Sequence, residues 1–358
     1  MSDNNHRNVP LYTASALQVA CKAVNRCTDA ESAAQVRMAT LARIQSYVNV
    51  HVKFVNFHNG STVRLVVLPE YFLSGFPLGE SHEEWHAKGV IEYGGPEYEF
   101  LGKVAQDNNI FLCGNVYEVD PNFPELYFQT CFIIGPNGDV ILRYRRLSSA
   151  FEVTPHDVLD KYLDLYGLEG LFPVAKTELG NLACIASEEI MWPELVRANC
   201  LRGAEVLLHP TSEPGSPKTT DRQAARKARA MENQIYIVSA NTSSIDDIPI
   251  PAYTCSAMSN VTDYHGDIMA EAAAGGESMI AHAILDIDTL RAQRRRVGMS
   301  NQFSRQLTDV YAMMYAEYPL RTGNTLLKDG KVQTPPDRDW FKHRQSDLLE
   351  RLTKAGLL

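Results

Sequence analysis

The sequence predicts an α/β domain followed by a C-terminal extension. Short runs rich in leucine and β-branched residues alternate with segments whose apolar residues recur every three or four positions, and this alternation stops near the end of the chain. Such a pattern indicates strands alternating with amphipathic helices, and hence a sheet with helix-covered faces. Hydrophobic residues make up 45% of the 358 residues and charged residues 22%. This balance excludes a disordered chain, a collagen-like chain and a coiled coil.

The first expected elements are a strand, a helix and a second strand. The segment LYTASALQVACKAV (11–24) has the composition of an opening strand. Helical periodicity runs through 28–49, and Thr28 or Asp29 is placed to cap the N-terminus of that helix. A continuous valine and leucine run over 63–68 indicates a strand buried on both faces.

A helix, a strand and a hairpin are expected next. The helix covers EYEFLGKVAQDNN (97–109) and the strand covers IFLCGNVYE (110–118). Two further β runs within 127–147 are separated by the sequence GPNG at 135–138, which is a turn sequence. This part of the chain therefore predicts an antiparallel hairpin.

The second half repeats the alternation. Strands are expected over 180–187, 205–212 and 235–243, helices over 192–204 and 221–234, and further β hairpins within 253–286. From about residue 301 the sequence lacks strand signals, and we interpret it as an extension or arm. The predicted boundaries are therefore 1–300 for the domain and 301–358 for the extension.

Charge and cysteine content limit the partners and the compartment. The formal net charge is −9, and no basic block is present, which argues against a nucleic-acid groove or an anionic membrane surface. No apolar run approaches the roughly 20 residues that span a bilayer, and the polar N-terminus MSDNNHRNVP lacks the apolar core of a signal peptide. We therefore expect a cytoplasmic protein. Seven scattered cysteines without a CxxC pair predict neither a disulfide framework nor a zinc knuckle, and Cys113, Cys131 and Cys184 are interpreted as buried apolar residues.

Ionisable and hydroxyl side chains follow three of the predicted strands. Glu70 comes after the strand at 63–68, Arg146 ends the hairpin, and Ser187 ends the strand that begins at residue 180. In α/β proteins, ligands bind in the crevice outside the carboxyl ends of the strands. If these ends lie side by side, a carboxylate, a guanidinium and a hydroxyl meet in one pocket. Taken singly, each could instead be a capping or surface residue.

Five motifs, in order, carry a resemblance to a known family. LPEYFLSGFP, YRRL, SEEIMWPELVR, ARKARAMENQIYIVSAN and SNVTDYHGDI resemble the motifs of the nitrilase superfamily of carbon–nitrogen hydrolases, over about residues 11–286. The resemblance implies a four-layer α-β-β-α sandwich and a small amide or nitrile as substrate. It implies no metal, nucleotide or organic cofactor. It also implies pocket walls from 78–90 and 151–171, and a homodimer or larger homo-oligomer with the arm beyond about residue 301 crossing to a partner.

The family's active site is a Glu, a Lys and a nucleophilic Cys. The resemblance places Glu70 at the Glu position, Arg146 at the Lys position and Ser187, six residues before Pro193, at the Cys position. Cys184 lies nine residues before that proline, so it would take the nucleophile's place only if the strand end slipped by three residues.

Three further residues are candidates for contacting the substrate. Glu152 loosely matches a second carboxylate that many family members carry after the lysine, although a solvated loop acid is an equal interpretation. Glu188 lies in the turn where the family binds the oxyanion. Its neighbour Glu189 is also acidic, so at least one of the two is expected to face away. His209, at the end of the strand 205–212, is a pocket-wall residue first and a base second.

The substitutions leave more than one hypothesis open. A serine hydroxyl is a far weaker acid than a thiol, and arginine can donate to an oxyanion but cannot shuttle a proton. The chain is then either a hydrolase, using Ser187 or an activated water with Glu70 as base and Arg146 as stabiliser, or an inactive descendant that binds a small ligand or serves as an assembly subunit. A third hypothesis, that Ser187 was introduced to trap a substrate, is disfavoured by Arg146, because such a change would leave the lysine in place.

Overall fold

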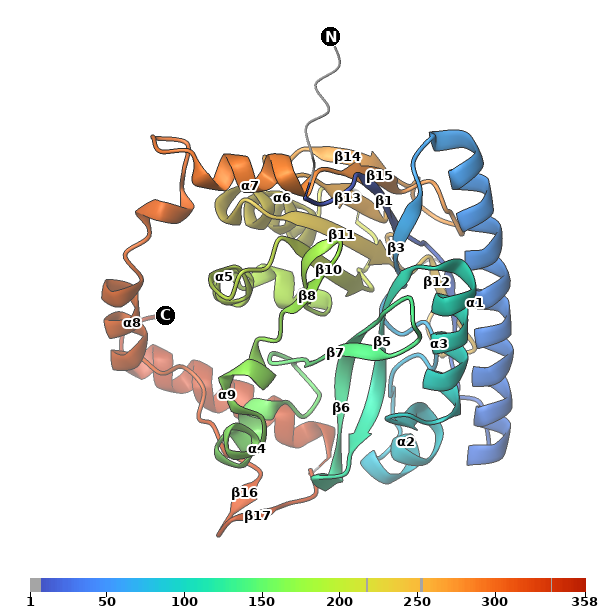
Figure 1. Cartoon of the computed structure of the whole chain (residues 1–358). Helices are drawn as coiled ribbons and strands as arrows, with labels where there is room; N and C mark the ends of the chain where they lie inside the picture. Colours follow the sequence, from blue (N-terminus) through green and yellow to red (C-terminus); the bar gives the residue numbers. More distant parts are fainter. Residues whose placement is uncertain (1–7, 217, 252–253, 336) are drawn as a thin grey trace.

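Two β-sheets pack face to face, and helices cover both outer faces of the pair in the computed structural model (Figure 1). The structure describes residues 8–216, 218–251, 254–335 and 337–358. The expectation of no signal peptide rests on residues 1–10, of which residues 1–7 lie outside the described residues. The two facing sheets, with helices on both outer faces, confirm the predicted four-layer α-β-β-α sandwich.

The first sheet holds both ends of the domain. Its strands lie in the order β15-β1-β3-β5-β6-β7, and β4 pairs with the far end of β5. Their bounds are β1 Tyr12–Ala16, β3 Val63–Val67, β4 Val90–Glu92, β5 Phe111–Asp120, β6 Phe123–Ile134, β7 Val140–Arg145 and β15 His282–Leu285. The predicted hairpin is β6 and β7, and β15 returns late in the chain to pair with β1.

The second sheet contains the strands of the second half. Its order is β14-β13-β11-β10-β9-β8, and β9, β10 and β11 are parallel to one another. The bounds are β8 Ala175–Thr177, β9 Gly180–Cys184, β10 Val206–Thr211, β11 Tyr236–Asn241, β13 Asn260–Thr262 and β14 Ile268–Glu271. A small separate pair joins β2 Ala20–Lys22 to β12 Ser244–Asp246.

The helices form the outer layers and the C-terminal extension. Helices α1 and α3 cover the first sheet, and α5 and α6 cover the second (Figure 1). The bounds are α1 Ala30–Asn59, α2 His82–Gly89, α3 Pro96–Asn108, α4 Leu159–Leu171, α5 Pro193–Leu201, α6 Asp221–Asn233, α7 Ile287–Arg295, α8 Thr308–Glu317 and α9 Arg338–Lys354. Within the described ranges, none of these helices has both the length and the apolar character needed to cross a bilayer.

Local sequence explains where the longest helix begins and ends. Asp29 is the N-cap of α1, and its carboxylate accepts a hydrogen bond of 2.8 Å from the backbone N–H of Ser32. Of the two caps expected from the sequence, the structure uses Asp29. Gly60, at φ 62°, ends the helix in a conformation that residues with a Cβ rarely adopt. The helix runs ten residues beyond the periodic segment 28–49.

Small side chains line the space between the two sheets. Ala14 and Ala16 of the first sheet face the same core as Cys113 and Cys184, and all four are buried. The sulfur atoms of Cys113 and Cys184 lie 3.7 Å apart. Because Cys184 is packed between the sheets, it is a core residue and not a nucleophile that faces a ligand.

The C-terminal extension folds back onto its own chain. It contains a short hairpin, β16 Leu327–Lys328 with β17 Lys331–Val332. The expectation that this region has no strand is therefore wrong, because four residues pair around a tight turn at Asp329, which has φ 50°. Leu326 and Phe341 are buried in an apolar cluster that also contains side chains of α4.

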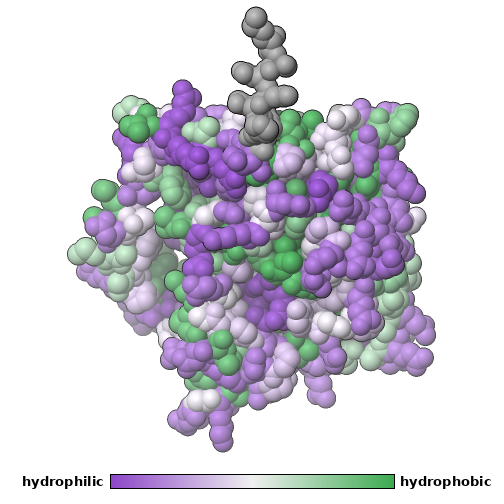
Figure 2. All heavy atoms as spheres, in the orientation of Figure 1, coloured by the Kyte–Doolittle hydropathy of each residue, from purple (hydrophilic) through white to green (hydrophobic). Residues whose placement is uncertain are grey.

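Helix α8 is the exposed part of the extension. Its apolar side chains gather at the left edge of the molecule (Figure 2), where Tyr311, Met313, Met314 and Tyr315 are each at least 46% exposed. A helix that is apolar on its outer face is typical of an interaction surface. Assembly through this arm stays a prediction.

His51 makes the stability of the fold depend on pH. It is fully buried on α1, neither ring nitrogen has a hydrogen-bond partner within the described ranges, and its ring centroid lies 5.9 Å from that of His282. Burial, and secondarily His282, lowers the pKa of His51 from 6.5 to about 4. Below the unfolded pKa the unfolded chain binds the proton and the folded protein does not, so stability is lost as the pH falls from 6.5 towards 4.

Replacing His51 by leucine is expected to remove this loss. Between about pH 7.5 and pH 5, the parent should lose about 2 kcal/mol more unfolding free energy than the His51→Leu variant. Urea unfolding at the two pH values measures the difference. Parallel changes in the two proteins would contradict this assignment.

Candidate active site

The predicted site residues come from strand ends that meet at one edge of the paired sheets. Strand β7 is antiparallel to β6, which is antiparallel to β5, so β7 runs in the same direction as β3 and β5. Glu70 and Arg146 therefore emerge at the same edge of the first sheet. Ser187 follows β9 in the facing sheet, and all three residues are at most 4% exposed.

Arg146 is the centre of the cluster. Its Nη1 lies 3.2 Å from Glu70 Oε1 and donates to Gln129 Oε1 at 2.5 Å. Its Nη2 forms an ion pair with Glu188, and its Nε donates to the carbonyl oxygen of Ser148 at 2.8 Å. The guanidinium is thus held between two carboxylates, and most of its N–H groups already have acceptors.

Glu70 is bound through one oxygen and free at the other. Its Oε1 accepts a hydrogen bond of 2.7 Å from Gln129 Nε2, in addition to the contact with Arg146. Its Oε2 is buried and has no hydrogen-bond partner within the described ranges. Burial raises the pKa of Glu70, and Arg146 opposes this rise. A buried carboxylate with one unpaired oxygen can accept a proton from a group that enters the site.

Ser187 has an unusual backbone conformation. Its φ is 53°, in the left-handed region, at the start of the 3-10 helix Ser187–Met191. Its hydroxyl accepts a hydrogen bond of 3.3 Å from Arg222 Nη1, which also donates to the carbonyl oxygen of Ser212 at 3.1 Å. A residue other than glycine in this conformation is strained, and such strain is concentrated at functional sites.

Sequence reasoning missed Gln129 and Arg222. Gln129 lies within the apolar run YFQTCFII of β6, where a buried amide requires partners. Arg222 lies in the first turn of α6, where the helix dipole disfavours a positive charge. Each residue type is thus energetically unfavourable at its position in the secondary structure. This mismatch is the sequence signal that could have identified the two residues as part of a site.

Glu188 faces the two arginines. Its side chain is 27% exposed, and its Oε2 pairs with Arg146 and lies 3.8 Å from Arg222 Nη2. Burial acts to raise the pKa of Glu188, but Arg146 and Arg222 outweigh it, so the pKa is lowered. The cluster around Ser187 therefore contains two carboxylates, Glu70 and Glu188, and two guanidinium groups, Arg146 and Arg222, so that its formal charges cancel.

Glu189 turns away from this cluster. Its Oε1 accepts hydrogen bonds from the hydroxyl of Tyr144 and from the backbone N–H groups of Leu147 and Ser148, at 2.8 to 3.0 Å. Its Oε2 accepts from the N–H of Ala186 at 2.9 Å. Glu189 therefore connects the turn at Ser187 to the loop after Arg146. It is the one of the two adjacent acids that faces away from the cluster, as expected from the sequence.

His209 supports the turn from behind. Its Nε2 lies 2.7 Å from the carbonyl oxygen of Ser187, and its Nδ1 lies 2.9 Å from Ser239 Oγ. Burial, followed by Arg226, lowers the pKa of His209 to about 3. Both ring nitrogens are occupied by the protein and neither meets the Ser187 hydroxyl, so this geometry does not place His209 as a base or as a ligand contact.

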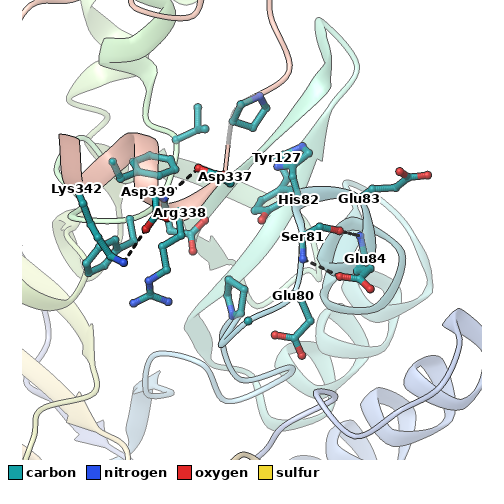
Figure 3. Close-up of a pocket in the computed structure, with 17 residues that line it drawn as sticks. Glu80, Ser81, His82, Glu83, Glu84, Tyr127, Asp337, Arg338, Asp339 and Lys342 are labelled. Atoms are coloured by element: carbon teal, nitrogen blue, oxygen red, sulfur yellow. Dashed lines mark hydrogen bonds and ion pairs between the residues drawn. The ribbon is translucent and has the colours of Figure 1, made fainter. Parts of the chain in front are cut away.

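A cavity of about 630 Å³ lies between the start of α9 and the loop that precedes α2. Figure 3 shows its walls, which come from residues 77 and 79–84, Tyr127, residues 151–153 and the start of α9. Glu152 lines this cavity, and burial raises its pKa to about 8 against the opposing effects of Arg146 and Arg338. Of the site residues expected from the sequence, Glu152 lines this cavity, whereas Glu70, Arg146, Ser187, Glu188 and His209 do not. Over the described ranges, no group of three or more His, Cys, Asp or Glu side chains is arranged to hold a metal ion.

Comparisons with known proteins agree with this architecture. The sequence model of the carbon–nitrogen hydrolase family matches residues 29–295. The omega-amidase NIT2-A of Xenopus laevis is 24% identical over 248 residues, which are 69% of this chain and 85% of that protein.

Two solved structures are similar in fold. Saccharomyces cerevisiae Nit3, a member of branch 10 of the nitrilase superfamily, has a TM-score of 0.62 at 20% identity, covering 84% of this chain and 99% of Nit3. An amidase from Nesterenkonia sp. AN1, with an acetamide moiety added covalently at its active site cysteine, has a TM-score of 0.57 at 16% identity, covering 84% of this chain and 96% of that one.

Proposed function

This chain belongs to the carbon–nitrogen hydrolase family, and we propose that it hydrolyses a small amide or nitrile at an altered site. In this proposal Ser187 attacks the substrate, Glu70 is the base, and Arg146 and Arg222 stabilise negative charge. The observation that carries the proposal is the strained, buried Ser187, whose hydroxyl lies 3.3 Å from a guanidinium, in a cluster with a carboxylate that has a free oxygen.

The two arginines favour a serine as the nucleophile. A hydroxyl loses its proton far less readily than a thiol, so an alkoxide needs positive charge close to it. Arg222 supplies a direct N–H to Ser187 Oγ, and Arg146 lies on the other side of Glu188. Buried charges are costly to keep, so their retention at this edge favours a function in the pocket.

Hydrolysis of an amide at this site passes through an acyl ester of Ser187. The Ser187 oxygen forms a bond to the carbonyl carbon while its proton passes to Glu70, and the arginines face the resulting oxyanion. The carbon–nitrogen bond then breaks, and the proton on Glu70 moves to the leaving amine. Water attacks the acyl ester with Glu70 again as base, which releases the carboxylic acid and restores the Ser187 hydroxyl.

Ligand binding without turnover is the second candidate function. It is favoured by the contacts of Arg146, whose Nη1 and Nη2 are both engaged by acceptors of the protein itself. An arginine held in this way cannot turn to an oxyanion unless one of these contacts breaks. In this alternative the site keeps its shape and charge but performs no acyl transfer.

Removing the Ser187 hydroxyl tests the proposal. We expect the parent to release ammonia from simple aliphatic amides and the Ser187→Ala variant to lose at least about 10²-fold in kcat, because the attacking atom is gone. Ser15→Ala is the matched control, since Ser15 is also fully buried and its hydroxyl has no partner among the described residues. Equal rates in the parent and in Ser187→Ala would contradict a serine nucleophile.

The double variant Ser187→Cys/Arg146→Lys separates the two candidates. It restores the thiol and amine that the family uses. If this variant hydrolyses amides while the parent is inert, the parent is a binding protein derived from an enzyme.

A further inference from the structure

The C-terminal extension contains a second cavity, of about 260 Å³. Its walls come from residues 320–322 and 325, in the linker between α8 and β16, and from residues 344, 347, 348 and 351 of α9. The residues of the Ser187 cluster do not line it, and the family match ends at residue 295. This cavity is therefore separate from the candidate active site and lies outside the family's common domain.

Three arginines line this second cavity. Arg344 and Arg351 lie two turns apart on one side of α9, and Arg321 comes from the linker. The one carboxylate in the lining is Asp347, and no ion pair joins it to these arginines in the described part of the chain. The whole chain has a net charge of −9, so its composition alone does not account for a cluster of three guanidinium groups.

Two of the three guanidinium groups are held in place by contacts with the protein. Arg344 Nη1 lies 2.7 Å from Asp157 Oδ1, and the guanidinium carbon of Arg344 lies 4.4 Å from the centre of the Trp340 ring. Arg351 Nη2 donates a hydrogen bond to the carbonyl oxygen of Leu320. An arginine has five N–H donors, so these contacts orient the two side chains and leave further donors for a ligand.

Arg321 is the arginine without a partner. Its side chain forms no hydrogen bond and no ion pair with any residue that the structure describes. Burial, followed by Arg344, lowers the pKa of Arg321 below its usual value, although Asp157 acts in the opposite direction. Asp157 is already shared, because its Oδ1 accepts hydrogen bonds from both Arg344 and the hydroxyl of Thr325. The cavity thus has more positive than negative charge, and an anion would balance it.

We propose that the cavity between the linker and α9 binds a phosphate group, either as free phosphate or as the monoester of a small molecule. A phosphate monoester carries close to two negative charges at neutral pH and has three strong acceptor oxygens. Guanidinium groups bind such oxygens through pairs of parallel hydrogen bonds. A carboxylate carries one charge and two oxygens, so it would leave part of this cluster without an acceptor.

The size and the position of the cavity limit its ligand and its effect. Its volume of about 260 Å³ is below the roughly 300–1,000 Å³ of sites for drug-sized molecules, which favours a small anion. The arginines come from two segments of the extension, so a bound phosphate would join the linker to α9. This site would bind its ligand whether or not the Ser187 site hydrolyses an amide.

Calorimetric titration of the intact protein with inorganic phosphate tests the proposal. The parent is expected to bind phosphate, and Arg321→Gln is expected to weaken binding about 10- to 100-fold, because it removes charge-assisted hydrogen bonds. Arg321 has no partner among the described residues, so this change should leave the fold intact, which urea unfolding without phosphate checks. Lys103→Gln is the control, because it removes one positive charge from an exposed pair with Asp107 on α3, outside the extension.

Two further anions separate a phosphate site from a general attraction of negative charge. Acetate at the same ionic strength should bind more weakly than phosphate, and glycerol 3-phosphate shows the source, since tighter binding than phosphate indicates a monoester and weaker binding indicates free phosphate. Phosphate should also slow hydrogen exchange in the linker 318–326 of the parent and not of Arg321→Gln. The proposal is overturned if the parent binds no phosphate, if acetate binds equally well, or if Arg321→Gln and Lys103→Gln bind phosphate equally.

Discussion

Replacing Glu70 by glutamine is expected to lower the kcat for amide hydrolysis by about 10²- to 10⁴-fold. Glutamine keeps the size of the side chain and its contact with the Arg146 guanidinium, but it cannot accept the Ser187 proton. Of the two carboxylate oxygens of Glu70, Oε2 is the one that has no hydrogen-bond partner among the described residues. Ammonia release under saturating amide measures the loss.

The pH profile provides a second measurement for the same variant. Because burial raises the pKa of Glu70 above its usual value of 4.5, the carboxylate is protonated and inactive at a pH where an exposed glutamate would still be ionised. The kcat/KM of the parent should therefore fall on the acid side at a pH above 4.5, and the residual activity of Glu70→Gln should lack this limb.

Glu97→Gln is the matched control for Glu70→Gln. Glu97 is also buried, and it pairs with Arg37 at 2.8 Å on the outer side of the first sheet. This variant should lose stability but keep its activity. If both variants lower kcat equally, Glu70 acts through the fold and not as a base.

The second large effect is expected from Arg226→Met, which should lower the unfolding free energy by about 3–5 kcal/mol. Arg226 and Glu213 form an ion pair in which both side chains are at most 2% exposed. Glu213 also accepts a hydrogen bond of 3.2 Å from the Thr220 hydroxyl. Removing the arginine leaves a buried carboxylate without its cation, and the desolvation cost then falls on the folded state.

A double variant shows whether the cost comes from the unpaired charge. Arg226→Met/Glu213→Leu removes both charges and should recover much of the lost stability, because a buried pair is often replaceable by apolar side chains. Lys354→Met, which breaks an exposed pair with Glu350, should cost about 0.5 kcal/mol or less. Urea unfolding of the four proteins gives the comparison. A small loss in Arg226→Met would show that Glu213 finds water or another partner.

Several features of the fold follow from local sequence. Asp29 caps α1 because its carboxylate reaches an N–H three residues away, and the GPNG sequence closes the β6–β7 hairpin because it suits a tight turn. These interactions join residues that are near in the chain. The hairpin in the extension was missed because two-residue strands are too short to show a periodic pattern.

The candidate site was only partly accessible from the sequence. Motif order placed Glu70, Arg146 and Ser187 at strand ends, and the structure brings those strand ends to one edge. Gln129 and Arg222 were not predicted, because their roles depend on contacts with residues 59 and 35 positions away in the chain.

The order of the elements, the family motifs and the chemical identity of the groups at the strand ends can all be read from the amino-acid sequence. The folded chain is needed to show that Arg146 is held between two carboxylates, that His209 faces the carbonyl oxygen of Ser187, and that Arg338 lines the cavity. These contacts cannot be read from the sequence because hydrogen bonds and ion pairs act over about 3–4 Å in space. Which distant residues come within that range depends on how the two sheets and the extension pack.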